Sequence, residues 1–309
     1  MPVKQHIPKA LRYTVRDFDK EFPNDDACLD YLMEQRWPGR VTQCAKCGVE
    51  RKHYRIKGRT AYSCDHCGTQ IYPLAGTIME KTTTPLKTWF YAMYLMGSTR
   101  CGISAKQIQR ECGVTYKTAW RMFKQIRSML SDGDLQLEGP TVEMDETWMG
   151  GVQKGRKGRP PGWDEKKTPV VAIVQRRGKV IAKTVPTVDH HQLTSLIKKH
   201  VTPGSTIYTD ELASYKQIKF LRDDEGIPLQ YRHRHIKHSA GVYVKGDIHT
   251  NTVEGLWSLI KNGIRGVYHS VSPDYLQTYL DEFTFRYNRR HDGNQQFRAI
   301  LKRVAERVA

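Results

Sequence analysis

Two pairs of cysteines, each with the spacing Cys-x-x-Cys, place the strongest constraint on how this chain can fold. Cys44 and Cys47 form the first pair and Cys64 and Cys67 the second, with 16 residues between the pairs. Each pair can present two thiolates to one zinc ion from a tight turn, and the two pairs together complete a closed tetrahedral site. The spacing therefore predicts one structural Zn²⁺ held by four cysteines.

The surrounding sequence predicts that this site is a zinc ribbon over residues 41–75, preceded by an N-terminal helical segment over residues 1–40. Between the pairs, "KHYRI" and "TAYSC" resemble short strands, and a glycine follows each pair, where the turn needs a positive φ angle. Zinc would supply the folding energy of a segment too small to be stable alone. The chain has seven cysteines and no export signal, which argues against a disulfide framework.

Residues 80–131 show the pattern of a helix-turn-helix domain. After a helix that begins near Pro85, the sequence "GISAKQIQRECGVTYKTAWRMFKQIRSML" divides around Gly113 into a short helix and a longer one, which Thr115 would cap. The apolar positions that we expect to face inward are Ile103, Ala105, Ile108, Ala119, Met122, Phe123 and Ile126. The positions that would face a DNA groove or phosphates are Tyr116, Lys117, Arg121 and Lys124. A plain helical hairpin with a solvated basic face is the alternative.

After a linker at residues 132–140 the pattern changes from helical to extended. Residues 170–185 read as a hairpin with a turn at Arg177 and Gly178, followed by an amphipathic helix capped by Asp189 and a strand that ends on Asp210. This order predicts an α/β RNase H-like catalytic domain, a mixed sheet with flanking helices, over residues 141–295. Residues 296–309 would be the end of a C-terminal helix.

Three acids stand at positions where this sheet could bring them together. Asp145 lies in the middle of a strand and breaks the alternation set by Val142 and Met144, and Asp210 would lie on the neighbouring strand. Buried carboxylates repel one another unless cations offset their charge, so the pair indicates two Mg²⁺ or Mn²⁺ ions of the kind that catalyse phosphodiester displacement. Glu254, on a helix, is the candidate third ligand.

Each acid also has a structural interpretation. Glu143 and Glu146 flank Asp145, so some of these acids could be solvated, and Asp210 could cap the segment that follows it. Asn251 and Glu254 have the spacing of a capping box, in which Asn251 is the N-cap. The combination of three acids on the expected strands and helix favours catalysis.

Basic residues are concentrated beside these acids. The loop at residues 150–168 could hold a phosphate backbone through Lys154, Arg156, Lys157 and Arg159. A second segment contains His233 and His235 among Arg and Lys residues, and a DNA-contacting face is favoured there over a second zinc site.

The net charge of +18 favours a polyanionic partner, with nucleic acid ahead of a membrane surface. There is no apolar run long enough to span a membrane and no secretory signal at the N-terminus, so the expected location is the cytoplasm.

Taken together, these motifs resemble bacterial insertion-sequence transposases of the zinc-ribbon and DDE type, the ISXO-two-like group. The matching segments are "CAKC", "CDHC", "VTYKTAWRM", "VEMDETWMGG", "YTDELASYK", "HTNTVEGLWSLIKNGIRGVYH" and "YLDEFTFRYNRR", from about residue 25 to residue 300.

The resemblance implies that Asp145, Asp210 and Glu254 form the catalytic acid triad and that Lys261 contacts DNA. Some relatives place Asn where this chain has Glu, which makes Asn251 the rival third ligand. The ribbon and helix-turn-helix would recognise the terminal inverted repeats, in a complex that is dimeric or larger. One site would act twice: hydrolysis at the element's end leaves a 3′ hydroxyl, which then attacks target DNA. The rival functions are a non-cutting DNA-binding regulator and a nuclease or resolvase that cleaves without joining.

Overall fold

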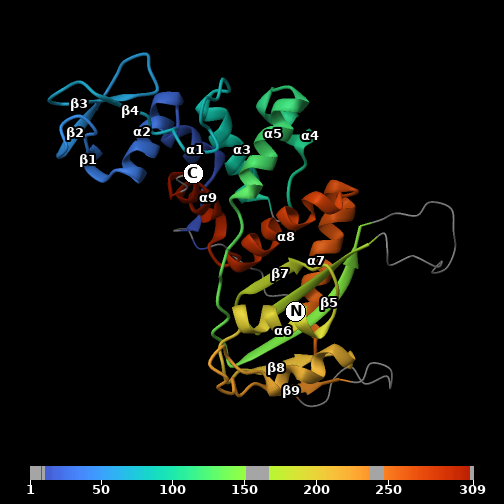
Figure 1. Ribbon diagram of the computed structural model, residues 1–309. Helices are drawn as coiled ribbons and strands as arrows, with labels where there is room; N and C mark the ends of the chain where they lie inside the picture. Colours follow the sequence, from blue (N-terminus) through green and yellow to red (C-terminus); the bar gives the residue numbers. More distant parts are fainter. Residues whose placement is uncertain (1–7, 9–10, 100, 151–166, 237–246, 307–309) are drawn as a thin grey trace. The chain divides into compact units, whose positions relative to one another are not determined.

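The computed structural model describes residues 8, 11–99, 101–150, 167–236 and 247–306 (Figure 1). The chain forms two compact units. Unit 1 combines Met1–Leu130 with His291–Ala309, and unit 2 is Ser131–Arg290. No helix in the described part is long and apolar enough to cross a membrane.

Unit 1 is mainly helical and includes residues from both the N-terminal and the C-terminal parts of the chain. Its helices are α1 (Val15–Glu21), α2 (Asp25–Arg36), α3 (Leu86–Ser98), α4 (Ala105–Cys112), α5 (Tyr116–Ser128) and α9 (Gln296–Glu306). The ring of Phe297 on α9 packs against Phe18, Phe22 and Tyr94. At the contact of α3 with α9, a Cβ on Gly97 would lie 2.8 Å from the backbone nitrogen of Phe297, so only glycine allows this approach. Residues 296–309, expected as the end of a helix following the catalytic domain, thus belong to unit 1.

Four short strands form a separate antiparallel sheet within unit 1. They are β1 (Val41–Gln43), β2 (Glu50–Arg55), β3 (Tyr62–Cys64) and β4 (Gln70–Ile71), paired in that order. Cys44 and Cys47 lie in the turn between β1 and β2, whereas Cys64 ends β3 and Cys67 lies in the turn that follows it. The expected strands between the pairs are confirmed.

Helices α4 and α5 have the expected local structure. Gly113, at the end of α4, is left-handed with φ 64°, and the Thr115 hydroxyl accepts a hydrogen bond of 3.2 Å from the backbone nitrogen of Thr118. All seven positions expected to face inward are buried. The four expected to face outward are exposed. The use of this face for DNA remains a prediction.

Unit 2 is built on a mixed five-stranded sheet, as the sequence predicts. Its strands are β5 (Thr141–Met149), β6 (Thr168–Gln175), β7 (Val180–Thr184), β8 (Thr206–Thr209) and β9 (Arg232–His235), in the order β7-β6-β5-β8-β9. Strands β5, β6 and β7 pair antiparallel, whereas β8 pairs parallel to β5 and β9 parallel to β8. The long strand β5 is therefore central and can carry functional residues from the middle of the sheet.

Helices cover both faces of this sheet (Figure 1). On one face, α6 (His190–His200) and the 3-10 segment η3 (Ala213–Phe220) pack on a core that includes Val142, Met144 and Ile207. On the other face lie α7 (Asn251–Gly263), its π-helical extension η5 (Ile264–Tyr268) and α8 (Pro273–Asn288). Successive residues of a strand face opposite sides, so β5 presents alternate residues to these two layers.

Candidate active site and zinc site

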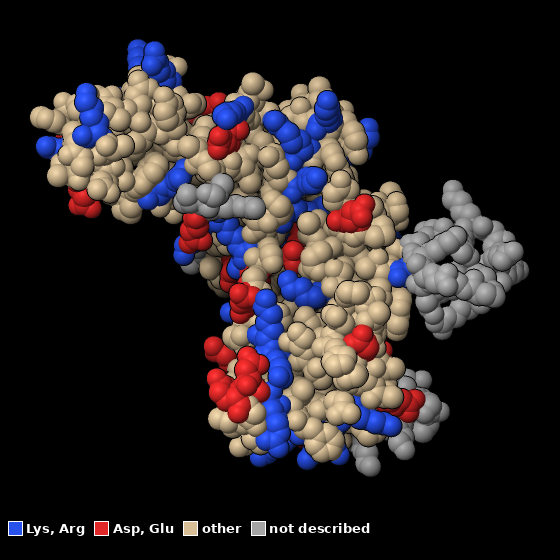
Figure 2. Space-filling model, viewed as in Figure 1, with Lys and Arg blue, Asp and Glu red and all other residues tan. Residues whose placement is uncertain are grey.

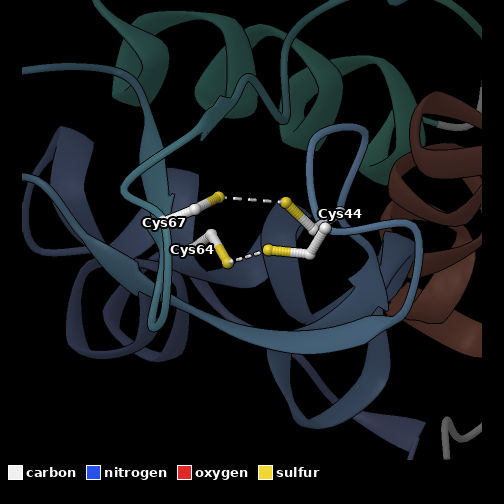
Figure 3. Close-up of side chains that lie close together, drawn as sticks. Cys44, Cys64 and Cys67 are labelled. Carbon is white, nitrogen blue, oxygen red and sulfur yellow. Dashed lines mark hydrogen bonds between the residues drawn. The ribbon is translucent and has the colours of Figure 1, made fainter.

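The four cysteines converge as the sequence predicts. Their sulfur atoms all lie within 4.8 Å of one another, with Cys44 Sγ 3.5 Å from Cys67 Sγ and Cys47 Sγ 3.9 Å from Cys64 Sγ. Figure 3 shows the labelled cysteines pointing toward a common centre. A tetrahedral zinc ion with Zn–S distances of about 2.3 Å requires sulfur atoms about 3.8 Å apart. The donor set and its spacing therefore fit Zn²⁺.

The two turns that present these thiols have the same backbone structure. The nitrogens of Gly48 and Gly68 donate to the carbonyls of Cys44 and Cys64 at 2.9 and 3.2 Å. Both glycines have the expected positive φ, 72° and 70°. A hydrogen bond with Thr69 is the main factor that lowers the pKa of the Cys67 thiol, to about 6, which favours the thiolate that binds zinc.

The sheet brings Asp145 and Asp210 together. Glu143 of β5 pairs in parallel register with Tyr208 of β8. Asp145 lies two residues after Glu143 within β5, and Asp210 lies two residues after Tyr208, directly after the end of β8. The oxygen atoms of Asp145 and Asp210 approach within 4.8 Å, and both side chains are partly buried. Asp210 Oδ1 also accepts a hydrogen bond of 3.0 Å from the backbone nitrogen of Leu212, so its capping role coexists with its place beside Asp145.

The third carboxylate of this cluster is one that the sequence reasoning missed. Among the described residues, the acids whose oxygens lie mutually within 4.8 Å are Asp145, Glu146 and Asp210. Glu146 accepts a hydrogen bond from the hydroxyl of Tyr215, a fully buried residue of η3. Neighbouring residues of a strand point to opposite faces, so the sequence predicts that Glu146 points away from Asp145. Glu146 joins the cluster because the segment after β8 brings Asp210 and Tyr215 to its side chain.

Burial and the charges of neighbouring acids make Asp145 and Glu146 hold protons more tightly than usual. Desolvation is the largest cause that raises the pKa of Asp145 to about 6, with the charges of Asp210 and Glu254 adding to it. Desolvation likewise raises the pKa of Glu146 to about 7. A cation placed between the carboxylates would offset this cost, and acids with such shifts mark candidate functional sites.

These shifts predict the pH dependence of divalent-metal binding. Because protons are held up to about pH 6 to 7 and a metal must displace them, affinity is expected to fall as the pH decreases through that range. For each carboxyl proton that the metal must displace, the affinity for the metal falls about tenfold with each pH unit below the pKa of that carboxyl group. We expect Mn²⁺ titrations of the zinc-loaded chain to give an affinity at least about tenfold weaker at pH 5.5 than at pH 8. Equal affinities at the two pH values would contradict the prediction.

Glu254 lies near this cluster but outside its closest group. It is exposed on the first turn of α7, and its Oε1 accepts a hydrogen bond of 2.9 Å from the Thr250 hydroxyl. The capping-box interpretation of Asn251 is wrong, because Asn251 is already helical and Thr250 is the N-cap residue. One turn after Glu254, the indole nitrogen of Trp257 donates to Asp145 Oδ2 at 2.8 Å, which ties α7 directly to the site.

Glu143 is the second acid whose position the sequence reasoning missed. The interpretation that it could be solvated is wrong, since Glu143 is 0% exposed. Its carboxylate contacts the start of α7 and the side chain of Arg176. Glu143 alternates with the apolar residues Val142 and Met144, as a solvent-facing residue of a strand would, so the local sequence carries no signal of its burial.

The predicted DNA-contacting residues are divided between the two units. Lys261, on α7, is partly buried, and desolvation lowers its pKa against the opposing effect of Asp145. Arg121 is exposed, yet it donates to the Thr84 hydroxyl at 3.3 Å and lies over the Trp89 ring, so part of its role is structural. The loop residues Lys154, Arg156, Lys157 and Arg159 lie outside the described residues. Figure 2 shows Lys and Arg side chains on the visible face of each unit.

His233 and His235, the candidate ligands of a second zinc site, both lie on β9. His233 Nε2 lies 2.9 Å from the Thr209 hydroxyl, and desolvation lowers the pKa of His233 to about 4. Within the described residues, neither histidine belongs to a group of three or more potential metal ligands.

Comparison with known families gives two matches along the chain. Residues 136–288 match the family described as ISXO2-like transposase domain. Residues 23–70 match the transposase zinc-ribbon domain. The two matches contain the acid cluster and the four cysteines respectively.

A curated relative is the uncharacterized protein in transposable element ISH50 of Halobacterium salinarum. It is 28% identical over 304 residues, which cover 92% of this chain and 98% of the relative. Similar solved structures include a pre-cleavage Mos1 transpososome, with 14% identity, 64% and 73% coverage of the two chains and a TM-score of 0.26. A Mos1 transposase paired-end complex with the left transposon end has 12% identity, 66% and 75% coverage and a TM-score of 0.28.

Proposed function

The chain belongs to the ISXO2-like transposase family, and from that premise we propose that it binds the terminal inverted repeats of an insertion sequence and catalyses metal-dependent cleavage and strand transfer. The observation that carries the proposal is the meeting of Asp145 and Asp210 on neighbouring parallel strands of a mixed sheet. Unit 2 is the proposed RNase H-like catalytic domain.

We propose that Asp145 and Asp210 are ligands of two Mg²⁺ or Mn²⁺ ions and that Glu254, on α7, is the third protein ligand. Oxygen donors in a partly buried site suit these hard cations. When bound, such a metal pair activates the attacking oxygen and stabilises the leaving oxygen of an in-line displacement. Trp257 orients Asp145 by donating to its Oδ2. Lys261, in the last turn of α7, would attract the phosphate backbone.

Unit 1 is the proposed DNA-recognition part. Its zinc-bound ribbon and the exposed face of α5 would read the element's ends, through Tyr116, Lys117, Arg121 and Lys124. The net charge of +18 supports a DNA partner. Membership of the family supports a dimer or larger complex on paired DNA ends as the proposed acting form. With DNA as substrate, the proposed location is the cytoplasm, at the nucleoid.

The test combines purified zinc-loaded chain, a labelled fragment that carries an element end, and a target plasmid. In Mg²⁺ we expect cleavage at the end followed by joining to the plasmid, and neither product with Asp210→Ala. Both proteins must bind the end fragment equally in a mobility-shift measurement, so that the loss is assigned to chemistry. Equal joining by Asp210→Ala would refute the proposed site, and cleavage without joining would identify a nuclease instead.

A further inference from the structure

Glu143 and Asp145 lie on the same face of β5, because side chains two residues apart in a strand point to the same side. Both reach α7: Glu143 contacts Thr252 and Val253, and Asp145 contacts Trp257. Strand β5 thus carries the proposed metal ligand Asp145. Through Glu143 it also contacts the start of α7, the helix that carries the proposed third ligand, Glu254.

Glu143 acts as the N-terminal cap of α7. Its Oε2 accepts hydrogen bonds from the backbone nitrogens of Thr252 and Val253 at 2.8 and 3.1 Å, and its Oε1 accepts one from the Thr252 hydroxyl at 2.8 Å. The first N–H groups of a helix have no partner within the helix, and a negative charge there is favourable. Thr250, the N-cap residue, makes no side-chain capping bond of its own. The cap is supplied from a strand more than one hundred residues earlier, which fixes the helix to the sheet.

Arg176 fixes the segment that leads into α7. Its Nε donates to Glu143 Oε1 at 2.7 Å, while Nη1 and Nη2 donate to the carbonyls of Asp247 and His249 at 2.7 and 3.0 Å. An arginine keeps its charge in proteins and offers several donors in a rigid plane. One side chain thus joins the buried carboxylate to the two backbone carbonyls that precede the helix.

We propose that Glu143 and Arg176 are positioning residues that set the place of α7 along β5 and thereby hold Glu254 at the distance from Asp145 that metal binding needs. This inference rests on the proposed metal site. A shift of α7 by one residue would move Glu254 by about 1.5 Å along the helix axis, whereas a functional group must be held within about 0.5 Å. Glu143 at the first turn and Trp257 about one turn later prevent that shift.

The test measures the affinity of the zinc-loaded chain for Mn²⁺ alone by electron paramagnetic resonance. Glu143→Gln keeps the shape of the side chain and removes its charge, and we expect its Mn²⁺ affinity to fall about tenfold or more, the loss typical of a residue that supports metal ligands. Glu282→Gln is the matched control, because Glu282 is also a fully buried acid of unit 2 bonded to an arginine, Arg286 on its own helix α8. Its contact with Tyr268 reaches the extension η5 and not the start of α7. We expect wild-type Mn²⁺ affinity in the control, even where its thermal stability falls as much as that of Glu143→Gln.

Arg176→Lys supplies a second variant should Glu143→Gln not fold, since the lysine keeps the charge beside Glu143 but loses the two carbonyl contacts. Faster hydrogen exchange at the amides of Thr252 and Val253 should accompany weaker Mn²⁺ binding in either variant. A folded Glu143→Gln or Arg176→Lys that binds Mn²⁺ as tightly as the wild type would overturn the inference, as would an equal loss in Glu282→Gln. Unchanged binding in Asp210→Ala would instead count against the proposed metal site itself.

Discussion

Replacing Asp145 by Asn is expected to reduce end cleavage more than about a hundredfold, because even a residue that only supports a metal ligand contributes about 10- to 100-fold to metal affinity. Asn keeps an oxygen that can accept from Trp257 but removes the charge that a divalent cation needs. The rate of end cleavage in Mg²⁺, measured beside DNA binding and thermal stability, checks the prediction. Because ionised Asp145 is costly to bury, the variant should be at least as stable as the wild type without metal.

The same assay distinguishes the two candidates for the third ligand. Glu254→Gln should lose cleavage to a similar extent, whereas Asn251→Ala, one turn earlier on the same helix, should keep most of it. The charge of Glu254 raises the pKa of Asp145, which indicates that its carboxylate is close enough to act on the site. The opposite result, with Asn251→Ala inactive and Glu254→Gln active, would assign the third position to Asn251 and leave Glu254 as a surface residue.

Cys64→Ser is expected to unfold the ribbon at residues 41–75 and to abolish binding to element ends. Structural zinc sites contribute about 10–16 kcal/mol of binding energy to small domains, far more than four short strands can supply by packing. The measurements are the zinc content of the purified chain, which should fall from one equivalent to near zero, and the affinity for the end fragment. Cys64 is buried and belongs to β3, so its loss affects both the metal and the sheet.

Cys101→Ser is the matched control for this loss. Cys101 is exposed and lies outside the four-cysteine group, so its replacement should leave the zinc content and DNA affinity unchanged. Full DNA binding by a zinc-free Cys64→Ser chain would show that the ribbon neither needs zinc nor reads the ends.

The features predicted best were those that depend on neighbours in the sequence. A Cys-x-x-Cys turn with its following glycine, or Thr115 at the start of α5, is a local arrangement whose residue types and spacing determine the backbone. The alternation of apolar residues in β5 and the continuous apolar run in β6 were sufficient to predict strands, and the order of the elements along the chain predicted a mixed sheet.

The features that escaped prediction depend on where distant elements meet. Glu143 looked like one of several acids near Asp145, and only the packing of α7 on β5 makes it a buried cap. Glu146 joins the cluster because Tyr215 on η3 and Asp210 after β8 come to its side of the strand. The capping box at Asn251 failed for the same reason: a partner from the sheet replaced the local one.

Because α9 belongs to unit 1, the core of unit 1 can be completed only after the whole of unit 2 has been synthesised. Phe297 is fully buried among aromatic residues from α1 and α3, but the ribosome releases it only after all of unit 2 has been made. The N-terminal part of a nascent chain must therefore wait, with an open aromatic core, until the catalytic part has emerged. A chain that stops before residue 296 never completes the core of unit 1. If unit 1 is the DNA-recognition part proposed above, prematurely terminated products would not occupy element ends or compete with the full-length protein.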